Sequence, residues 1–280
     1  MDDTRAPDLA PTDLGPADAA AALALSTAVG WNQTAADWAL FLARGRVIGC
    51  REESGRLVAT AATLPYDNGF GWISMVIVAP DWRRRGLARR LMTQSIATLR
   101  DQGRAALLDA TPAGAEVYAR LGFVALGGME RWEGEGGAVA HGDGVEVLCT
   151  EAVGHLIEAD RAAFGAQRAF LLRDFLAREG TLALAAGDAL AVLRRGKRAT
   201  QLGPVIAASA EAAGRLLAGA LAVVRGPVFL DLLDGWHSLA PLLEARGFRV
   251  QRPFRRMALG RSDLPGDAAR LVCAAGPEFG

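Results

Sequence analysis

MVIVAPDWRRRGLARRL, residues 75–91, joins an apolar, β-branched run to a segment with helical spacing through a loop that contains three arginines and a glycine. Where a helix begins, its first backbone amides have no partner within the helix, and the positive end of its dipole attracts anions. Gly86 permits a ligand to approach the backbone closely. Because the stretch contains neither GxGxxG nor GxxxxGK(S/T), it predicts a pyrophosphate site that is neither a dinucleotide fingerprint nor a P-loop.

Two motifs in this region resemble one known family. Arg83-x-x-Gly86-x-Ala88 resembles the acyl-CoA-binding signature (Arg/Gln)-x-x-Gly-x-(Gly/Ala) of the GNAT N-acetyltransferase superfamily. LLDATPAGAEVYARLGF, residues 107–123, resembles the family's following strand and helix with their Tyr-x-x-x-Gly-Phe ending, in the family's order and at its spacing. The resemblance implies an α/β (α+β) fold with a mixed, mostly antiparallel sheet flanked by helices. It also implies acetyl-CoA, or another short acyl-CoA, as co-substrate and no metal.

The same resemblance assigns functions to individual residues. Tyr118 stands where the family has the tyrosine that protonates the departing CoA thiolate. Trp31 and Asn32 lie in a region that lines the acceptor pocket in this superfamily, and Thr111 departs from the asparagine often found after the fifth strand. The residues implied to bind the cofactor are Val76, Ile77, Val78, Arg83, Arg84, Arg85, Gly86, Leu87, Ala88 and Thr111.

These residues also have ordinary structural explanations. Five arginines in residues 82–90 are compatible with a solvated helix start or with a nucleic-acid patch. Since the chain has 31 Lys+Arg against 31 Asp+Glu and a pI near 6.8, we expect no nucleic-acid partner. Tyr118 is compatible with packing beneath the sheet, Trp31 with a core position and Asn32 with a turn cap.

The second part of the chain repeats the first. LGF ends at Phe123 and RGF at Phe248, which are separated by 125 residues, and the loop glycine Gly86 falls on Gly214 at a separation of 128. A general alternation of strands and helices is the alternative explanation, but two anchors with nearly one period predict tandem copies of one fold. The alignment places Glu211 at Arg83, Leu216 at Ala88 and Leu243 at Tyr118, so we expect the second copy to have lost the cofactor site and the acid. This resembles two-domain bacterial GNAT proteins with a degenerate C-terminal domain.

The domain boundaries follow from this repeat and from composition. A length of 280 residues is typical of about two domains. We expect a flexible N-terminal tail, a catalytic domain, a degenerate domain and a C-terminal tail. A glycine-rich segment, residues 134–144, predicts a hairpin loop or linker between the domains. The boundaries are 1–12 for the N-terminal tail, 13–134 for the catalytic domain, 145–260 for the degenerate domain and 261–280 for the C-terminal tail.

Composition excludes several classes of protein. Cys50, Cys149 and Cys273 are far apart and form no CxxC pair, so we expect packing residues in a reducing compartment rather than a disulfide framework or a zinc site. The acidic, proline-bearing N-terminus is not a signal peptide, and no window of about 18 apolar residues predicts a membrane span. A cytoplasmic protein without a membrane partner, either monomer or homodimer, is expected.

The predicted function is direct transfer of an acetyl group from acetyl-CoA to the amine of a small-molecule acceptor. Backbone amides near Ile77 and Val78 would polarise the acyl carbonyl. The general base stays open between a carboxylate, at Asp67, Asp109 or Glu116, the histidine His141, and water. The alternative function is a non-catalytic CoA-binding or sensing module, because no base is obvious.

Overall fold

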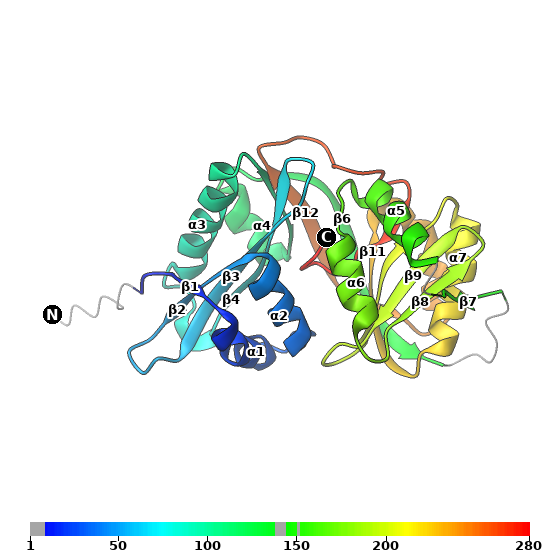
Figure 1. Ribbon diagram of the computed structural model, residues 1–280, viewed down its shortest axis with the longest axis horizontal. Coiled ribbons are helices and arrows are strands. Elements are labelled where there is room, and N and C mark those ends of the chain that lie inside the picture. Colours follow the sequence, from blue (N-terminus) through cyan, green and yellow to red (C-terminus); the bar gives the residue numbers. More distant parts are fainter. Residues whose placement is uncertain (1–8, 138–143, 150–151) are drawn as a thin grey trace.

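The computed structural model describes residues 9–137, 144–149 and 152–280. The chain forms two α/β halves placed side by side (Figure 1). Within the described residues the strands form one 13-stranded sheet in the order β1-β2-β3-β4-β5-β12-β6-β11-β13-β10-β9-β8-β7. The pairs β4–β5 and β10–β11 are parallel and the other pairs are antiparallel. The predicted fold class, a mixed and mostly antiparallel sheet flanked by helices, is therefore confirmed.

The first half begins with a short strand, β1, which starts at the last residue that the sequence analysis assigned to the tail, Thr12, and pairs with β2. The helix α2 begins with a capping box, in which Thr34 and Asp37 bond each other's backbone amides. The long helix α3 follows a left-handed glycine. The elements are β1 (Thr12–Leu14), α1 (Ala19–Ala28), α2 (Ala35–Arg44), β2 (Arg46–Arg51), β3 (Leu57–Pro65), β4 (Phe70–Val78), α3 (Leu87–Asp101), β5 (Ala105–Ala110), α4 (Pro112–Ala119) and β6 (Val124–Gly136).

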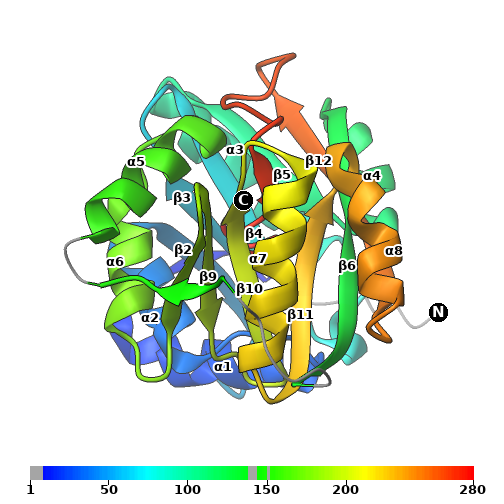
Figure 2. The same ribbon diagram turned by 90° about the vertical axis from the view of Figure 1, so that its right-hand side faces the viewer.

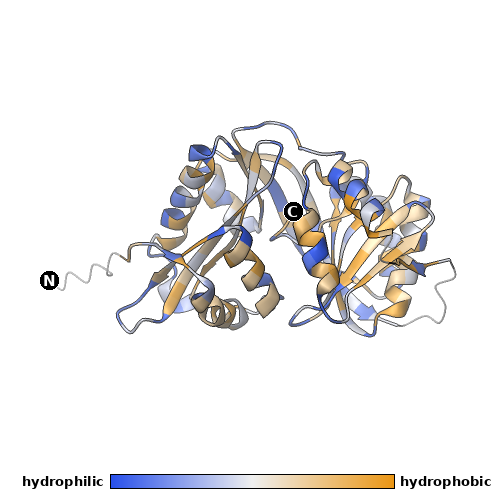
Figure 3. Cartoon of the chain, in the orientation of Figure 1, coloured by the Kyte–Doolittle hydropathy of each residue, from blue (hydrophilic) through white to orange (hydrophobic). Residues whose placement is uncertain are grey.

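The second half repeats this order, and its connection before the long helix, residues 207–209, is shorter than residues 79–86 of the first half. In Figure 1, α6 lies on the side that faces the first half and α7 lies on the far side; Figure 2 shows α7 in front of the sheet, running roughly along strands β10 and β11. Figure 3 shows apolar residues on the strands of both halves, as burial on both faces of a sheet requires. The elements are β7 (Glu146–Val147), α5 (Val153–Phe164), α6 (Ala169–Ala177), β8 (Leu182–Ala186), β9 (Ala189–Arg194), β10 (Thr200–Ile206), α7 (Ala210–Val223), β11 (Gly226–Leu233), α8 (Ala240–Glu244), β12 (Arg249–Leu259) and β13 (Leu271–Cys273).

The two halves exchange strands at the centre of the sheet. The strand β6 leaves the first half and pairs with β11, and β12 leaves the second half and pairs with β5. The two exchanged strands also pair with each other over most of their length. The sequence analysis placed β12 within the second domain, whereas in the structure it completes the sheet of the first. The boundary between the domains therefore does not follow the order of the chain.

Each exchanged strand is fixed by a buried ion pair of the same geometry. Arg256 of β12 donates two hydrogen bonds of 2.8 Å to Asp109 of β5, and Arg131 of β6 donates two of 2.8 Å to Asp231 of β11. Both aspartate side chains are fully buried. Two-pronged arginine–carboxylate bonds have strict geometry, so they define the register of the exchanged strands.

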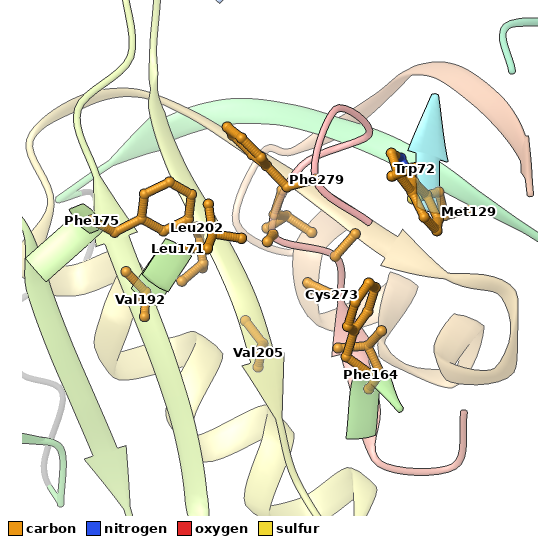
Figure 4. Packing of buried hydrophobic residues seen from close by; sticks show 14 of the residues in the cluster. Trp72, Met129, Phe164, Leu171, Phe175, Val192, Leu202, Val205, Cys273 and Phe279 are labelled. Atoms are coloured by element: carbon orange, nitrogen blue, oxygen red, sulfur yellow. The ribbon is translucent and has the colours of Figure 1, made fainter. Parts of the chain in front are cut away.

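The sequence analysis set residues 261–280 apart as a C-terminal tail, but residues 271–280 of this segment pack into the core. The strand β13 pairs with β10 and β11. Phe279 is fully buried and stacks on Phe41 at 5.0 Å between ring centroids, and its carbonyl accepts a hydrogen bond of 2.8 Å from the Tyr66 hydroxyl. Figure 4 shows Phe279 and Cys273 among side chains of the core. The segment thus joins the halves at their interface.

The structure places the three cysteines in different surroundings. Cys50 and Cys273 are buried, but Cys149 is exposed, so the interpretation of Cys149 as a packing residue is wrong. Within the described residues, no helix is long and apolar enough to cross a membrane. No group of three or more potential metal ligands occurs in the described ranges.

Candidate active site

Strands β4 and β5 separate partway along their length and open the sheet. They pair only from Phe70 to Trp72 against residues 105–107, although both strands continue further. In β4, Met75 and Val76 together face one residue of β3, which is a β-bulge, and Met75 adopts a φ of 54°. The Thr60 hydroxyl holds this bulge through a bond of 2.9 Å to the Met75 carbonyl. Backbone groups of β4 that would otherwise pair with β5 are thereby left for a ligand.

A cavity of about 440 Å³ lies at this opening and between the two halves. The predicted site residues Trp31, Asn32, Val76, Thr111 and Tyr118 all line it, so the structure brings together segments that are distant in sequence. Its other wall comes from the second half. That wall contains Arg198, Phe229, Gln251, Arg252, Phe254 and Glu278.

Tyr118 projects into this cavity from α4. Its ring contacts Phe123 in a tilted arrangement with centroids 6.1 Å apart. Burial raises the pKa of the Tyr118 phenol to about 12. The hydroxyl is therefore protonated at neutral pH, as a proton donor must be.

The loop before α3, residues 79–86, is held by side chains of the first half. Arg56 pairs with Asp81 and with Glu52, and the Trp82 indole donates a bond of 3.0 Å to Glu52. Hydrogen bonds from Arg56 and then Ser54 lower the pKa of Glu52 to about 2. Loop residues Arg83, Arg84, Arg85 and Gly86 are all exposed.

Gly86 occupies the N-cap position of α3 with a φ of 80°, and a Cβ there would meet no atom within 4 Å. The glycine is thus required by backbone conformation, and the space beside it is open to a ligand. The first amides of α3 lie at this open surface with three arginines around them, which fits a pyrophosphate.

The predicted cofactor residues do not all present their side chains to the opening. Ile77 and Leu87 are 2% and 4% exposed and belong to the hydrophobic core, so only their backbone groups are available to a ligand. The Val78 carbonyl accepts a bond of 3.3 Å from the Arg83 guanidinium. Ala88 is half-buried in the first turn of α3. Thr111 caps α4 by accepting a bond from the Gly114 amide at 3.3 Å.

Asn32 links the two halves. Its side-chain oxygen accepts bonds from the amides of Arg198 (2.9 Å) and Ala199 (3.0 Å), and its amide nitrogen donates to the Ala199 carbonyl at 3.1 Å. The Asn32 side chain lines the cavity, but its carbonyl oxygen already accepts two hydrogen bonds from backbone amides of the second half. Trp31 keeps a half-buried ring at the cavity wall.

The carboxylates that the sequence analysis named as candidate bases are either hydrogen-bonded to other groups or exposed on the surface. Asp109 is bound by Arg256, and burial raises its pKa although Arg256 opposes the shift. Asp67 accepts the Gln167 amide at 2.7 Å, and Glu116 is exposed on α4. His141 lies outside the described residues. The structure adds Glu278, which lines the cavity and accepts a bond of 2.9 Å from Arg194.

The second half repeats the turn but not the loop. Phe123 and Phe248 donate their amides to the carbonyls of Tyr118 and Leu243, at 3.1 Å and 3.0 Å, so the separation of 125 residues is structurally correct. Gly214, however, lies inside α7 rather than before it, so its alignment with Gly86 is wrong. The connection before α7 is residues 207–209 only, and Ser209 caps the helix by accepting the Ala212 amide at 3.2 Å.

We expect one CoA per chain. The first turn of α7 is capped by a serine and carries Glu211, whose carboxylate pairs with Arg215, so its anion site is blocked by the chain's own groups. Equilibrium dialysis of the full chain with CoA should saturate at one equivalent. A second equivalent that persists when Gly86 is replaced would place a CoA site in the second half.

Comparison with known proteins agrees with this geometry. Residues 22–123 match a sequence model described as Acetyltransferase (GNAT) family, and residues 156–272 match one described as Acetyltransferase (GNAT) domain. The Bacillus subtilis (strain 168) protein called uncharacterized N-acetyltransferase YitH is 26% identical over 223 residues, which are 75% of this chain and 76% of that protein.

Two solved structures share the architecture across most of the chain. A protein from Pyrococcus horikoshii superposes with a TM-score of 0.82 at 18% identity, covering 98% of this chain and 96% of the other. A tandem GNAT protein from the clavulanic acid biosynthesis pathway gives a TM-score of 0.63 at 18% identity, covering 91% and 100%. These likenesses show the fold of both halves together.

Proposed function

We propose, from the premise that this chain is a tandem-domain member of the GNAT acetyltransferase family, that its first half transfers an acetyl group from acetyl-CoA directly to the amine of a small molecule. One observation carries the proposal: the opening between β4 and β5 and the half-buried Tyr118 border one cavity, and the open loop at Gly86 directly follows β4. The second half contributes the wall where the acceptor binds.

The residues of the first half suit binding of acetyl-CoA. Amides at the start of α3 and the arginines Arg83, Arg84 and Arg85 would bind the pyrophosphate, and the separated edge of β4 around Val76 would bind the pantetheine arm. Acetyl-CoA supplies an acyl group activated as a thioester. The open space at the Gly86 Cα lets the pyrophosphate approach the backbone without a steric clash.

The chemistry follows from the positions of these groups. The acceptor nitrogen forms a bond to the acyl carbon while the carbon–sulfur bond breaks, and the sulfur leaves with the electron pair. Backbone amides near Ile77 and Val78 stabilise negative charge on the carbonyl oxygen. Tyr118 gives its proton to the sulfur, the proton of the amine passes to water in the cavity or to Glu278, and exchange with solvent returns a proton to the Tyr118 phenolate.

The test measures CoA binding and thiol release together. Gly86→Val forces a β-branched residue into a left-handed conformation and fills the open surface beside the loop. We expect calorimetry to show at least tenfold weaker CoA binding, with a similar loss of amine-dependent thiol release.

Gly103 provides the matched control. It lies just beyond the C-terminus of α3 with a φ of 68° and open space around it, so Gly103→Val has the same strain away from the loop. This variant should keep the CoA affinity of the wild type. Equal affinity in Gly86→Val would remove the loop from the site. CoA binding without thiol release for any amine would favour the alternative, a CoA-binding or sensing module.

A further inference from the structure

A second β-bulge directs Arg252 into the cavity. Val250 pairs with Trp132 and Arg252 with Arg131, so two steps along β12 correspond to one along β6 and Gln251 is the additional residue. Such bulges change the direction of side chains next to functional sites. Gln251 and Arg252 consequently both line the cavity, although they are adjacent in a strand.

Arg252 faces another arginine across the two exchanged strands. Arg131 is its direct partner in the ladder, and like charges in this position are unfavourable. The charge of Arg131 is compensated by Asp231, through two bonds of 2.8 Å. For Arg252, no carboxylate of the described residues lies within ion-pair distance. Its guanidinium carbon lies over the ring of Phe254, 5.0 Å from the ring centroid.

The carboxylates that line the cavity are already occupied. Asp109 is bound by Arg256 and Glu278 by Arg194, both from outside the cavity lining. Arg198, the other arginine of the wall, donates to the Gly30 carbonyl, which does not neutralise its charge. The wall therefore retains uncompensated positive charge. Burial and then the nearby Arg131 lower the pKa of Arg252, whereas Asp231 and Glu278 act in the opposite direction.

Three buried polar atoms of the lining have no partner in the described protein. They are the Nε of Arg252, the side-chain oxygen of Gln33 and the hydroxyl of Ser74. Buried polar groups are normally hydrogen-bonded, and one left without a partner costs free energy. Their concentration around one cavity is what a site for a polar ligand requires.

We infer that the acceptor is a small amine that also carries an anionic group, a carboxylate or a phosphate, and that Arg252 binds this group. The inference rests on the proposed function and names its substrate class. A planar guanidinium with several N–H donors matches both anions by paired hydrogen bonds. Gln33 and Ser74 would bind the remaining polar atoms of the acceptor.

The experiment compares matched acceptors by thiol release at saturating acetyl-CoA. Amino acids are paired with the amines that result from their decarboxylation, and O-phosphoethanolamine is paired with ethanolamine. We expect the wild type to prefer the anionic member of at least one pair, and the pair that shows it identifies carboxylate or phosphate. Arg252→Gln should raise the KM for that anionic acceptor at least tenfold. The KM for its neutral counterpart and the affinity for CoA should not change.

Arg255 is the matched control, since it lies three residues further along β12, is exposed and does not line the cavity. Arg255→Gln should retain the preference, and Arg252→Lys should retain part of it. Equal use of neutral and anionic amines by wild type and Arg252→Gln would overturn the inference while the proposed function stood.

Absence of thiol release for every amine would instead contradict the proposed function. In that case calorimetry with N-acetylglycine and N-methylacetamide decides the inference, because the two differ only in the carboxylate. Binding of N-acetylglycine alone, lost in Arg252→Gln, would support an anion site. Equal binding of both probes, or of neither, would overturn it.

Discussion

Tyr118→Phe should lower turnover by ~10²-fold or more with little change in CoA affinity. The substitution keeps the ring that packs against Phe123 and removes the hydroxyl, so the loss measures proton donation rather than packing. Stopped assays of thiol release at saturating acetyl-CoA give the turnover, and calorimetry gives the affinity. Unchanged turnover would assign Tyr118 to the cavity wall alone.

The pH profile gives a second measurement on the same residue. Burial raises the pKa of Tyr118 to about 12, so its hydroxyl stays protonated as pH rises through the usual phenol range. The ratio of wild-type to Tyr118→Phe turnover should therefore stay constant from about pH 7 to about pH 10, whereas an ordinary phenol would have lost about half of its protons at the upper limit. Tyr66→Phe is the control: it removes the other tyrosine hydroxyl, which bonds the Phe279 carbonyl, and should leave turnover unchanged.

Asp231→Asn should lower the free energy of unfolding by about 3–5 kcal/mol. The side chain is fully buried and accepts two bonds from Arg131 and one of 2.9 Å from Gln201. The asparagine side chain introduced at position 231 is neutral. It therefore leaves the guanidinium of Arg131 buried without a counter-charge, close to the uncompensated Arg252. Urea denaturation followed by tryptophan fluorescence measures the change.

Two further variants separate the ion pair from its surroundings. Glu133→Gln makes the same chemical change on β6, but its partner Arg249 is 81% exposed, so the cost should be at most about 1 kcal/mol. Adding Arg131→Met to Asp231→Asn removes the unpaired charge and should recover much of the stability. If Asp231→Asn costs no more than Glu133→Gln, the exchanged strand β6 is not fixed by this pair.

Several features followed from the sequence because local chemistry dictates them. The loop before α3 needs a glycine, since the backbone there is left-handed, and Gly86 supplies it. The turn after Tyr118 recurs after Leu243 because the same glycine conformation ends both helices, so the repeat was visible without a structure. The signature around Arg83 and the tandem organisation were predictable for this reason.

Other features depend on contacts between distant parts of the chain. The alignment of Gly214 with Gly86 failed because spacing alone does not show where a helix begins, and the loop before α7 is shorter. Burial of Ile77 and of Phe279 depends on which surface packs against each of them.

The division of the site between the halves was likewise beyond the sequence. The backbone groups of every strand offer the same hydrogen bonds, and the Arg256–Asp109 pair that fixes β12 against β5 joins residues 147 apart, so the order of residues does not state that β12 pairs with β5 rather than within its own half. That exchange brings Arg252 to a cavity built around Tyr118, and it leaves the arginine without a carboxylate partner among the described residues. The sequence by itself determined the fold family and the glycine turn before α3, because these depend on neighbouring residues. The tertiary structure alone decided the cavity wall of the second half, because its charged residues, Arg198, Arg252 and Glu278, come from three segments that are far apart in the sequence.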